Sequence, residues 1–193
     1  MARNKEYDKS NVLDAATRIF WEKGYTGTSV NALVKATGLG KRSMYQEFGS
    51  KQNLFRECLR NYIVNLNREA NTILNRHPQG LSNIEDFFAN RIDYASSCGC
   101  NGCMVINAAI EKELIDPGAF DMVQKALSGH EDAFFACLAA ARSSGEIPED
   151  KDCRVLAGFL MTFSAGMMVM CKTEPEKTAL AESVETALSV VKD

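Results

Sequence analysis

The chain has 193 residues, a mass of 21.3 kDa and 46% hydrophobic residues, enough to bury a core in one compact domain or two small ones. This composition excludes an intrinsically disordered chain. An uninterrupted apolar run of about eighteen residues and an amino-terminal export signal are both lacking, which predicts a cytoplasmic protein that does not interact with a membrane.

The formal net charge is -3, but the charges are distributed unevenly. Residues 1–51 contain nine Lys or Arg against five Asp or Glu, a net charge of +4, and the remainder carries -7. A basic amino-terminal part is attracted to DNA phosphates while the acidic part is repelled, which orients the protein on a duplex. The seven cysteines are an odd number in a chain without an export signal, so reduced thiols are expected.

The first predicted helix starts near Asp8 or Ser10 and ends at Gly24. Its apolar residues recur at helical spacing, so we expect it to pack against the two helices that follow. Trp21 lies on this helix, and we interpret it as a core residue or as a contact between domains.

Residues 28–51 predict two short helices separated by a glycine-containing turn. The first has an apolar stripe and is expected to begin at an N-cap, Thr28, and to end at Gly38. The second has only Met44 and Phe48 on its apolar face, so its other side chains point outward. This is the pattern of a helix-turn-helix, whose second helix fits the major groove of DNA.

The stretch from Val12 to Leu59 resembles the DNA-binding domain of the tetracycline-repressor (TetR) family. The resemblance rests on three spaced motifs: Phe20-x-x-x-Gly24-Tyr25-x-x-Thr28-Ser29-Val30, Gly38-Leu39 and Tyr45-x-x-Phe48-x-Ser50-Lys51. It implies an all-α homodimer of about nine helices that binds a double-stranded DNA operator. Residues 1–50 would form a three-helix helix-turn-helix domain and residues 51–193 a helical effector-binding and dimerisation domain. The resemblance further implies a repressor released by a small-molecule effector and a subunit contact through the last two helices.

The candidate DNA contacts lie on the two helices of the helix-turn-helix and at the start of the next helix. Arg42 is the best base-reading candidate, because a guanidinium can donate two hydrogen bonds to a guanine edge. The resemblance assigns Tyr45 and Lys51 to phosphate contacts, and Ser29 and Thr28 can donate to the DNA backbone from a helix start. The full candidate set is Thr28, Ser29, Asn31, Lys41, Arg42, Ser43, Tyr45, Gln46 and Lys51.

From Ser50 onward one long helix is predicted, which Pro78 stops, and the remaining prolines divide the rest into helical segments without strand alternation. An effector pocket is expected where polar side chains interrupt apolar helical faces and where Met and aromatic residues cluster. An Arg91–Glu111 pair, a histidine satisfied within the core and ordinary core packing are the competing interpretations. The candidate pocket residues are Tyr62, Phe88, Arg91, Tyr94, Met104, Asn107, Glu111, His130, Phe134, Phe163 and Met167.

Cys98, Cys100 and Cys103 form a cluster in a glycine-containing segment. A zinc site would lack a fourth ligand at standard spacing, so no metal is expected. Closely spaced thiols, one of them near a helix start, also suit a redox or electrophile sensor. The third interpretation is that Cys103 is an ordinary packing residue.

Catalysis is not indicated, because the chain has no P-loop, no dinucleotide-binding glycine motif, no HExxH and no nucleophile elbow. The sequence therefore predicts a DNA-binding regulator that is not an enzyme and needs no cofactor. Two alternatives of other classes remain: a helical dimer that no longer binds DNA and acts through a protein partner, and a small-molecule-binding body that carries out chemistry.

Overall fold

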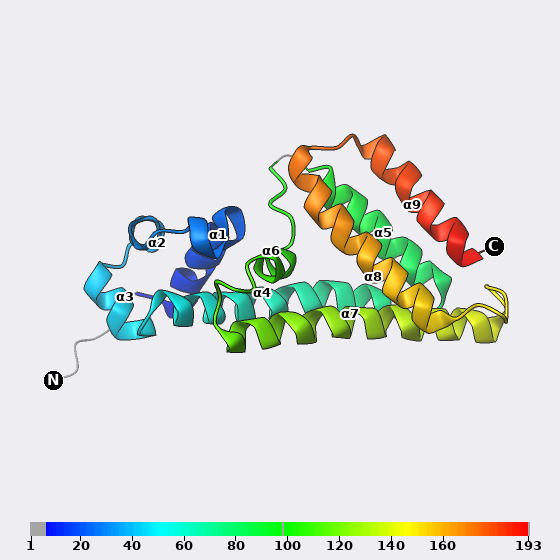
Figure 1. Ribbon diagram of the computed structural model, residues 1–193, viewed down its shortest axis with the longest axis horizontal. Helices are drawn as coiled ribbons and strands as arrows, with labels where there is room; N and C mark the ends of the chain where they lie inside the picture. The colour runs from blue at the N-terminus through cyan, green and yellow to red at the C-terminus, as the bar shows by residue number, and fades with distance from the viewer. Residues whose placement is uncertain (1–6, 98, 193) are drawn as a thin grey trace.

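The computed structural model describes residues 7–97 and 99–192, except for the side chains at 66, 67, 70 and 71. In that part of the chain it has nine α-helices, one short 3-10 helix and no strand, which confirms the all-α prediction of about nine helices (Figure 1). The elements are α1 (Lys9–Gly27), α2 (Val30–Thr37), α3 (Lys41–Phe48), α4 (Lys51–Leu74), α5 (Leu81–Ala95), α6 (Met104–Ile110), α7 (Pro117–Ser144), α8 (Cys153–Met170), η1 (Cys171–Thr173) and α9 (Lys177–Lys192).

Helices α1, α2 and α3 form a small amino-terminal domain at one end of the molecule (Figure 1). Its apolar positions meet in a core that includes Phe20, Leu33, Met44 and Phe48, each at most 4% exposed. A left-handed Gly38 ends α2, as the sequence predicts, because glycine adopts that backbone conformation without a Cβ penalty.

The long helix α4 connects this domain to the rest of the chain, and α7 lies alongside it (Figure 1). Helix α7 starts at Pro117 after an N-cap, Asp116, whose carboxylate accepts from the backbone N–H of Ala119 at 3.1 Å. Because α4 packs against α1 as well as against α5 and α7, a displacement of its first turns would also move the amino-terminal domain.

Helices α5, α8 and α9 lie together at the other end (Figure 1). By length and composition alone, the stretch Cys153–Thr173 could cross a membrane, with a mean hydropathy of 1.6. Packing in this fold accounts for part of its apolar character. One face of α8 is buried against neighbouring helices, and the opposite face carries exposed apolar side chains, namely Val155, Phe159, Val169 and Met170.

Candidate functional site

Helix α3 presents the outward-facing side chains expected of a recognition helix. Met44 and Phe48 hold its narrow apolar face in the core. The exposed side chains that remain are Lys41, Arg42, Tyr45 and Gln46, and the candidate Ser43 is half-buried beside them. The arrangement leaves two cations, a phenol and an amide free to reach base edges and phosphates.

The other DNA-contact candidates lie at helix starts. Ser29 is exposed and caps α2, its hydroxyl accepting from the N–H of Ala32 at 3.1 Å, and Asn31 is exposed in the same turn. Lys51 begins α4, and its ammonium lies 4.2 Å from the centroid of the Tyr25 ring. Burial lowers the pKa of Lys51, although the carboxylate of Glu111 opposes the shift.

The prediction for Thr28 is wrong. Its side chain is fully buried, and its hydroxyl donates to the carbonyl oxygen of Gly24 at 2.6 Å. Ser29, not Thr28, is the N-cap of α2. Thr28 therefore holds the backbone before α2 in place and does not face DNA.

Glu47 is the acidic residue on α3, and it is engaged within the protein. Its carboxylate accepts from the hydroxyl of Tyr7 at 2.8 Å and lies 3.7 Å from the ammonium of Lys9. These contacts keep the negative charge against α1, where it is directed away from the cationic side chains of α3.

Glu111 connects the body to the amino-terminal domain. Its carboxylate accepts from the backbone N–H groups of Tyr25 at 2.7 Å and Thr26 at 2.9 Å. Gly24 makes this approach possible: its φ is +71°, and a Cβ there would lie 2.9 Å from Oε2 of Glu111. The competing interpretation of an Arg91–Glu111 pair is therefore not realised, and Glu111 lines neither the cleft nor the cavity described below.

The segment before α6 makes a second contact between the domains. The carbonyl oxygen of Gly102 accepts from the indole N–H of Trp21 at 2.8 Å and from the hydroxyl of Tyr94 at 2.9 Å. The amide of Asn107 donates to the carbonyl of Asn101 at 3.2 Å, and its oxygen accepts from Lys172 at 2.8 Å. Asn107 is thus a structural residue of this contact, and the interpretation of Trp21 as a contact between domains is confirmed.

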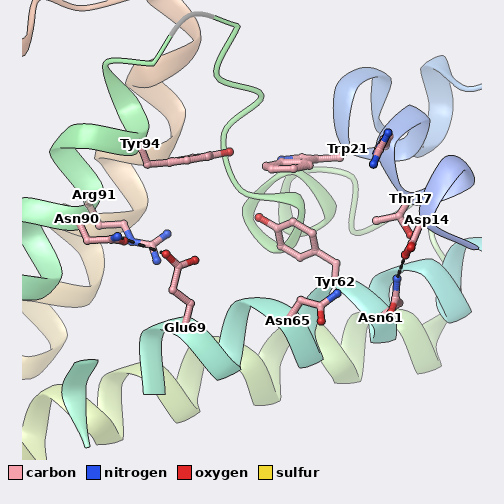
Figure 2. Close-up of a pocket in the computed structure, with 11 residues that line it drawn as sticks. Asp14, Thr17, Trp21, Asn61, Tyr62, Asn65, Glu69, Asn90, Arg91 and Tyr94 are labelled. Atoms are coloured by element: carbon pink, nitrogen blue, oxygen red, sulfur yellow. Dashed lines mark hydrogen bonds between the residues drawn. The ribbon is translucent and has the colours of Figure 1, made fainter. Parts of the chain in front are cut away.

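A cleft of about 320 Å³ lies where α1, α4 and α5 meet (Figure 2). Three candidate pocket residues line it: Tyr62 from α4, and Arg91 and Tyr94 from α5. Burial raises the pKa values of the Tyr62 and Tyr94 hydroxyls well above the usual range, so both tyrosines are neutral at physiological pH. Sequence analysis missed the polar residues of this cleft, which are Asp14, Thr17, Arg18, Asn61, Asn65, Glu69 and Asn90.

A smaller cavity of about 40 Å³ lies inside the body between α5, α6, α7 and α8. Arg91, His130 and Phe134 are the candidates that line it. Burial, and to a lesser extent the nearby Arg91 cation, lower the pKa of His130, whose Nδ1 lies 3.2 Å from the carbonyl oxygen of Ala126. The space suits a few water molecules and is far below the roughly 300–1,000 Å³ of typical small-molecule sites.

The remaining pocket candidates are core residues, as the competing interpretation holds. Phe88, Met104 and Met167 are at most 4% exposed and line neither cavity. Phe163 packs on Phe88 with ring centroids 5.6 Å apart. These side chains supply apolar surface to the body, which explains their spacing on the helices.

The thiol nearest to Cys100 among the described residues is one that the predicted cluster of Cys98, Cys100 and Cys103 does not include. Cys98 lies outside the described residues, and Cys103 is buried at the start of α6. Cys100 is half-buried, and its sulfur lies 2.6 Å from the sulfur of Cys171 in η1. Burial raises the pKa of Cys171 to about 12. Within residues 7–97 and 99–192, no three His, Cys, Asp or Glu side chains are placed to hold a metal ion.

Two family models match the two parts of this fold. Residues 12–58 match the model of bacterial regulatory proteins of the tetR family, and residues 80–187 match the tetracyclin repressor-like carboxy-terminal domain. The chain belongs to the TetR family. It is therefore a DNA-binding transcriptional regulator, and α2 and α3 are the helix-turn-helix of its TetR-type DNA-binding domain.

Full-length TetR-family relatives support the assignment. The uncharacterised HTH-type transcriptional regulator YezE of Bacillus subtilis (strain 168) is 30% identical over 193 residues, covering 99% of this chain and 100% of the relative. The HTH-type transcriptional repressor ComR of Escherichia coli (strain K12) is 30% identical over 191 residues, covering 96% and 90%. The similarity thus extends through the body of the protein.

Solved TetR-family structures share the fold. A cysteine mutant of the regulator CifR, in complex with a 26-base-pair operator duplex, superposes with a TM-score of 0.85 at 28% identity and covers 97% of this chain and 98% of its own. The reduced form of E. coli NemR has a TM-score of 0.80 at 16% identity, covering 92% and 93%, and shows the fold alone.

Proposed function

We propose that the protein is a repressor that binds a palindromic operator as a homodimer and is released by a small-molecule effector. The observation that carries the proposal is the exposed polar face of α3, which the buried Met44 and Phe48 hold outward from the domain core. ComR is a repressor and CifR binds an operator duplex, which supports the same activity here. We place DNA binding in residues 1–50 and effector binding and dimerisation in residues 51–193.

The contacts divide into base reading and phosphate binding. Arg42 reads a guanine edge through its two parallel donors, supported by the other polar side chains Asn31, Lys41, Ser43 and Gln46. Tyr45, Lys51 and the cap residue Ser29 bind phosphates, which set the position of α3 in the groove. Because phosphate contacts release counterions, binding should weaken steeply with salt.

The dimer forms through α8 and α9 in this proposal. Val155, Phe159 and Met170 are 67%, 37% and 53% exposed along one stripe of α8, and Val190 of α9 is 47% exposed. A second subunit would bury this surface by the hydrophobic effect. The resulting dimer would also place its two α3 helices in successive major grooves, about 34–36 Å apart.

Effector release needs two conformers that differ in the spacing of the α3 helices. An effector that binds the DNA-incompetent conformer more tightly shifts the population, and a change from 1:99 to 99:1 requires a preference of about 5.5 kcal/mol. Helix α4 is the element that would transmit the change, because it packs on α1 and on the body.

The test is salt-dependent binding to the duplex upstream of the protein's own gene, since regulators of this family often control adjacent genes. Arg42→Ala should weaken specific binding by about 1–3 kcal/mol, because one bidentate base contact is worth that much. Lys125→Ala, which removes an exposed cation on α7, should bind like the wild type. If Arg42→Ala leaves regulation in cells unchanged, the DNA-binding role is refuted in favour of a protein partner.

A second candidate signal is an oxidant acting on Cys100 and Cys171, whose sulfurs lie 2.6 Å apart. One molecule of hydrogen peroxide would oxidise the half-buried thiol of Cys100 to a sulfenic acid and release water. The thiol of Cys171 would then displace a second water and form a disulfide. The disulfide would constrain residues 100–102. It would therefore affect the carbonyl of Gly102, which accepts the hydrogen bond from Trp21.

This second candidate has its own test. Peroxide should reduce operator binding by the wild type, and Cys171→Ser should bind DNA normally but lose the response. Cys153→Ser, which removes a buried thiol at the start of α8, should respond like the wild type. Operator binding that is indifferent to peroxide would leave the small-molecule effector as the signal.

A further inference from the structure

The cleft between α1, α4 and α5 has the residues of a ligand site at the boundary between the two domains (Figure 2). Its volume, about 320 Å³, reaches the lower end of the range for small-molecule sites, whereas the inner cavity at about 40 Å³ does not. The two spaces share Arg91. The wider one is therefore the place to seek a ligand for that side chain.

Arg91 is a buried cation with an unused donor. Its side chain is 6% exposed, and its Nε–H has no hydrogen-bond partner. The guanidinium lies over the ring of Phe87, 5.0 Å from the centroid, a contact that does not use the N–H groups. A buried charged donor without an acceptor is unfavourable, so an anionic ligand that supplies the acceptor would gain a strong hydrogen bond.

Glu69 does not fill this role. Figure 2 shows Glu69 and Asn90 beside Arg91 at one end of the cleft, and the amide of Asn90 donates to the Glu69 carboxylate at 3.3 Å. Glu69 is exposed, and the Nε–H of Arg91 stays unpartnered next to it. A ligand that supplies the acceptor for Arg91 must therefore be small enough to enter the cleft beside Glu69 and Asn90.

Aromatic rings line the middle of the cleft, between Arg91 and the polar residues Asp14, Thr17 and Asn61 at the far end (Figure 2). The ring centroids of Trp21 and Tyr62 are 5.1 Å apart at an interplanar angle of 63°, and those of Trp21 and Tyr94 are 6.3 Å apart at 9°. The indole N–H of Trp21 and the hydroxyl of Tyr94 are both used by the carbonyl of Gly102. These rings therefore offer the cleft apolar surface, which suits the planar part of a ligand.

We propose that this cleft binds a small aromatic carboxylate, whose carboxylate accepts from Arg91 and whose ring packs against Trp21 and Tyr62. The inference rests on the proposed function in one respect, that such a ligand would act as the effector. Because Trp21 belongs to α1 and Arg91 to α5, the ligand would touch the DNA-binding domain and the body together. A ligand that binds one arrangement of these helices better than the other shifts their equilibrium.

The test uses Trp21, the single tryptophan of the chain, as the reporter. Phenylacetate and 3-phenylpropanoate are titrated into the full-length protein without DNA, and phenylacetamide serves as the uncharged control. We expect saturable changes in fluorescence with the carboxylates and at least about tenfold weaker binding of the amide, since a charge-assisted hydrogen bond is lost. Equal affinity for acid and amide, or no saturable response to either acid, overturns the proposal.

Variants identify the group responsible. Arg91→Met should bind the carboxylates at least about tenfold more weakly, yet melt no lower than the wild type without ligand, because a buried unpartnered charge is replaced by an apolar side chain of similar volume. Arg60→Met, which removes an exposed arginine of α4 that does not line the cleft, should bind like the wild type. Wild-type affinity of Arg91→Met refutes the assignment.

The two proposals fail in different measurements. The fluorescence titration contains no DNA, so a protein without operator affinity would still report on the cleft. Conversely, specific operator binding without any carboxylate response would leave the repressor intact and remove the aromatic carboxylate as its ligand.

Discussion

The carboxylate of Glu111, at the end of α6, accepts a 2.7 Å hydrogen bond from the backbone N–H of Tyr25 in the DNA-binding domain. The same carboxylate accepts from Thr26 at 2.9 Å. The two N–H groups follow the break in α1 at Gly24, where the helical hydrogen-bond pattern stops. A side chain of the body therefore completes the backbone hydrogen bonding of the segment that leads into α2.

Glu111→Gln should lower the free energy of unfolding by about 1.5–3 kcal/mol, because hydrogen bonds to a charged acceptor are lost and an amide N–H₂ faces a backbone donor. Urea denaturation measures the change. Glu113→Gln lies two residues further on, where the exposed carboxylate is 3.8 Å from Lys112, and should change stability by less than about 0.5 kcal/mol. Equal effects of the two substitutions would show that the contact with Tyr25 is not stabilising.

Gly102 provides a second test of the contact between domains. Its φ is +71°, and a Cβ there would lie 2.6 Å from the carbonyl oxygen of Met168. Gly99 has a φ of +74° and open space around it, so Gly99→Ala carries only the backbone strain of about 1–2 kcal/mol. Gly102→Ala should destabilise the protein more than Gly99→Ala does in thermal melts.

Fluorescence separates displacement of the Gly102 segment from general instability. In Gly102→Ala the carbonyl that accepts from Trp21 should move, so the emission maximum of the folded protein should shift relative to the wild type. Gly99→Ala should keep the wild-type spectrum. If both variants melt at the same temperature, the predicted clash with Met168 is absent.

The helix-turn-helix could be predicted because its signals are local. Gly38 ends α2, and Met44 and Phe48 define the buried side of α3 within a few residues. The error at Thr28 shows the limit of this approach, because adjacent hydroxyls can both cap a helix and only packing decides between them. Here Thr28 turned inward to Gly24, which left the cap to Ser29.

The sites of the body could not be predicted to the same extent, because their residues come from helices far apart in the chain. Arg91 and His130 stand out as polar residues on apolar faces, but nothing in their spacing shows that Arg91 borders a cleft built by α1. Likewise, Cys171 is 71 residues from Cys100, and the cysteine spacing before α6 does not point to it. Sequence analysis places Glu111 among the pocket candidates, because nothing in the sequence marks the backbone N–H groups of Tyr25 and Thr26 as its hydrogen-bond partners.

Stability should fall below neutral pH because of His130. Burial lowers the pKa of His130 in the folded protein from its usual value of 6.5. The unfolded chain thus takes up a proton near pH 6.5 that the folded chain binds only at lower pH, so the free energy of unfolding decreases as the pH falls from about 6.5. Above that pH both states are neutral at this position and the contribution is constant.

Denaturation at pH 7.5 and 5.0 measures this dependence. His130→Gln should reduce the loss of stability between the two pH values, because the titrating group is gone. His77→Gln removes the other histidine of the chain, which is exposed, and should keep the wild-type pH dependence. An unchanged pH dependence in His130→Gln would assign the loss to other groups.

The exposed stripe of α8 predicts the effect of a single charge on assembly. Phe159 is 37% exposed in the single chain, and Val155 lies beside it on the stripe. In a subunit interface Phe159→Glu would bury a charge without a partner, so the variant should sediment as a monomer of 21.3 kDa while the wild type has twice that mass.

Val64→Glu places the same charge on α4, where Val64 is 54% exposed, and should remain a dimer. Both variants should keep the wild-type helical content, because neither position belongs to the core. A monomer would present one α3 helix where the operator offers two half-sites, so Phe159→Glu should also lose most of its operator affinity. A Phe159→Glu dimer with wild-type affinity would place the subunit contact elsewhere than on this stripe.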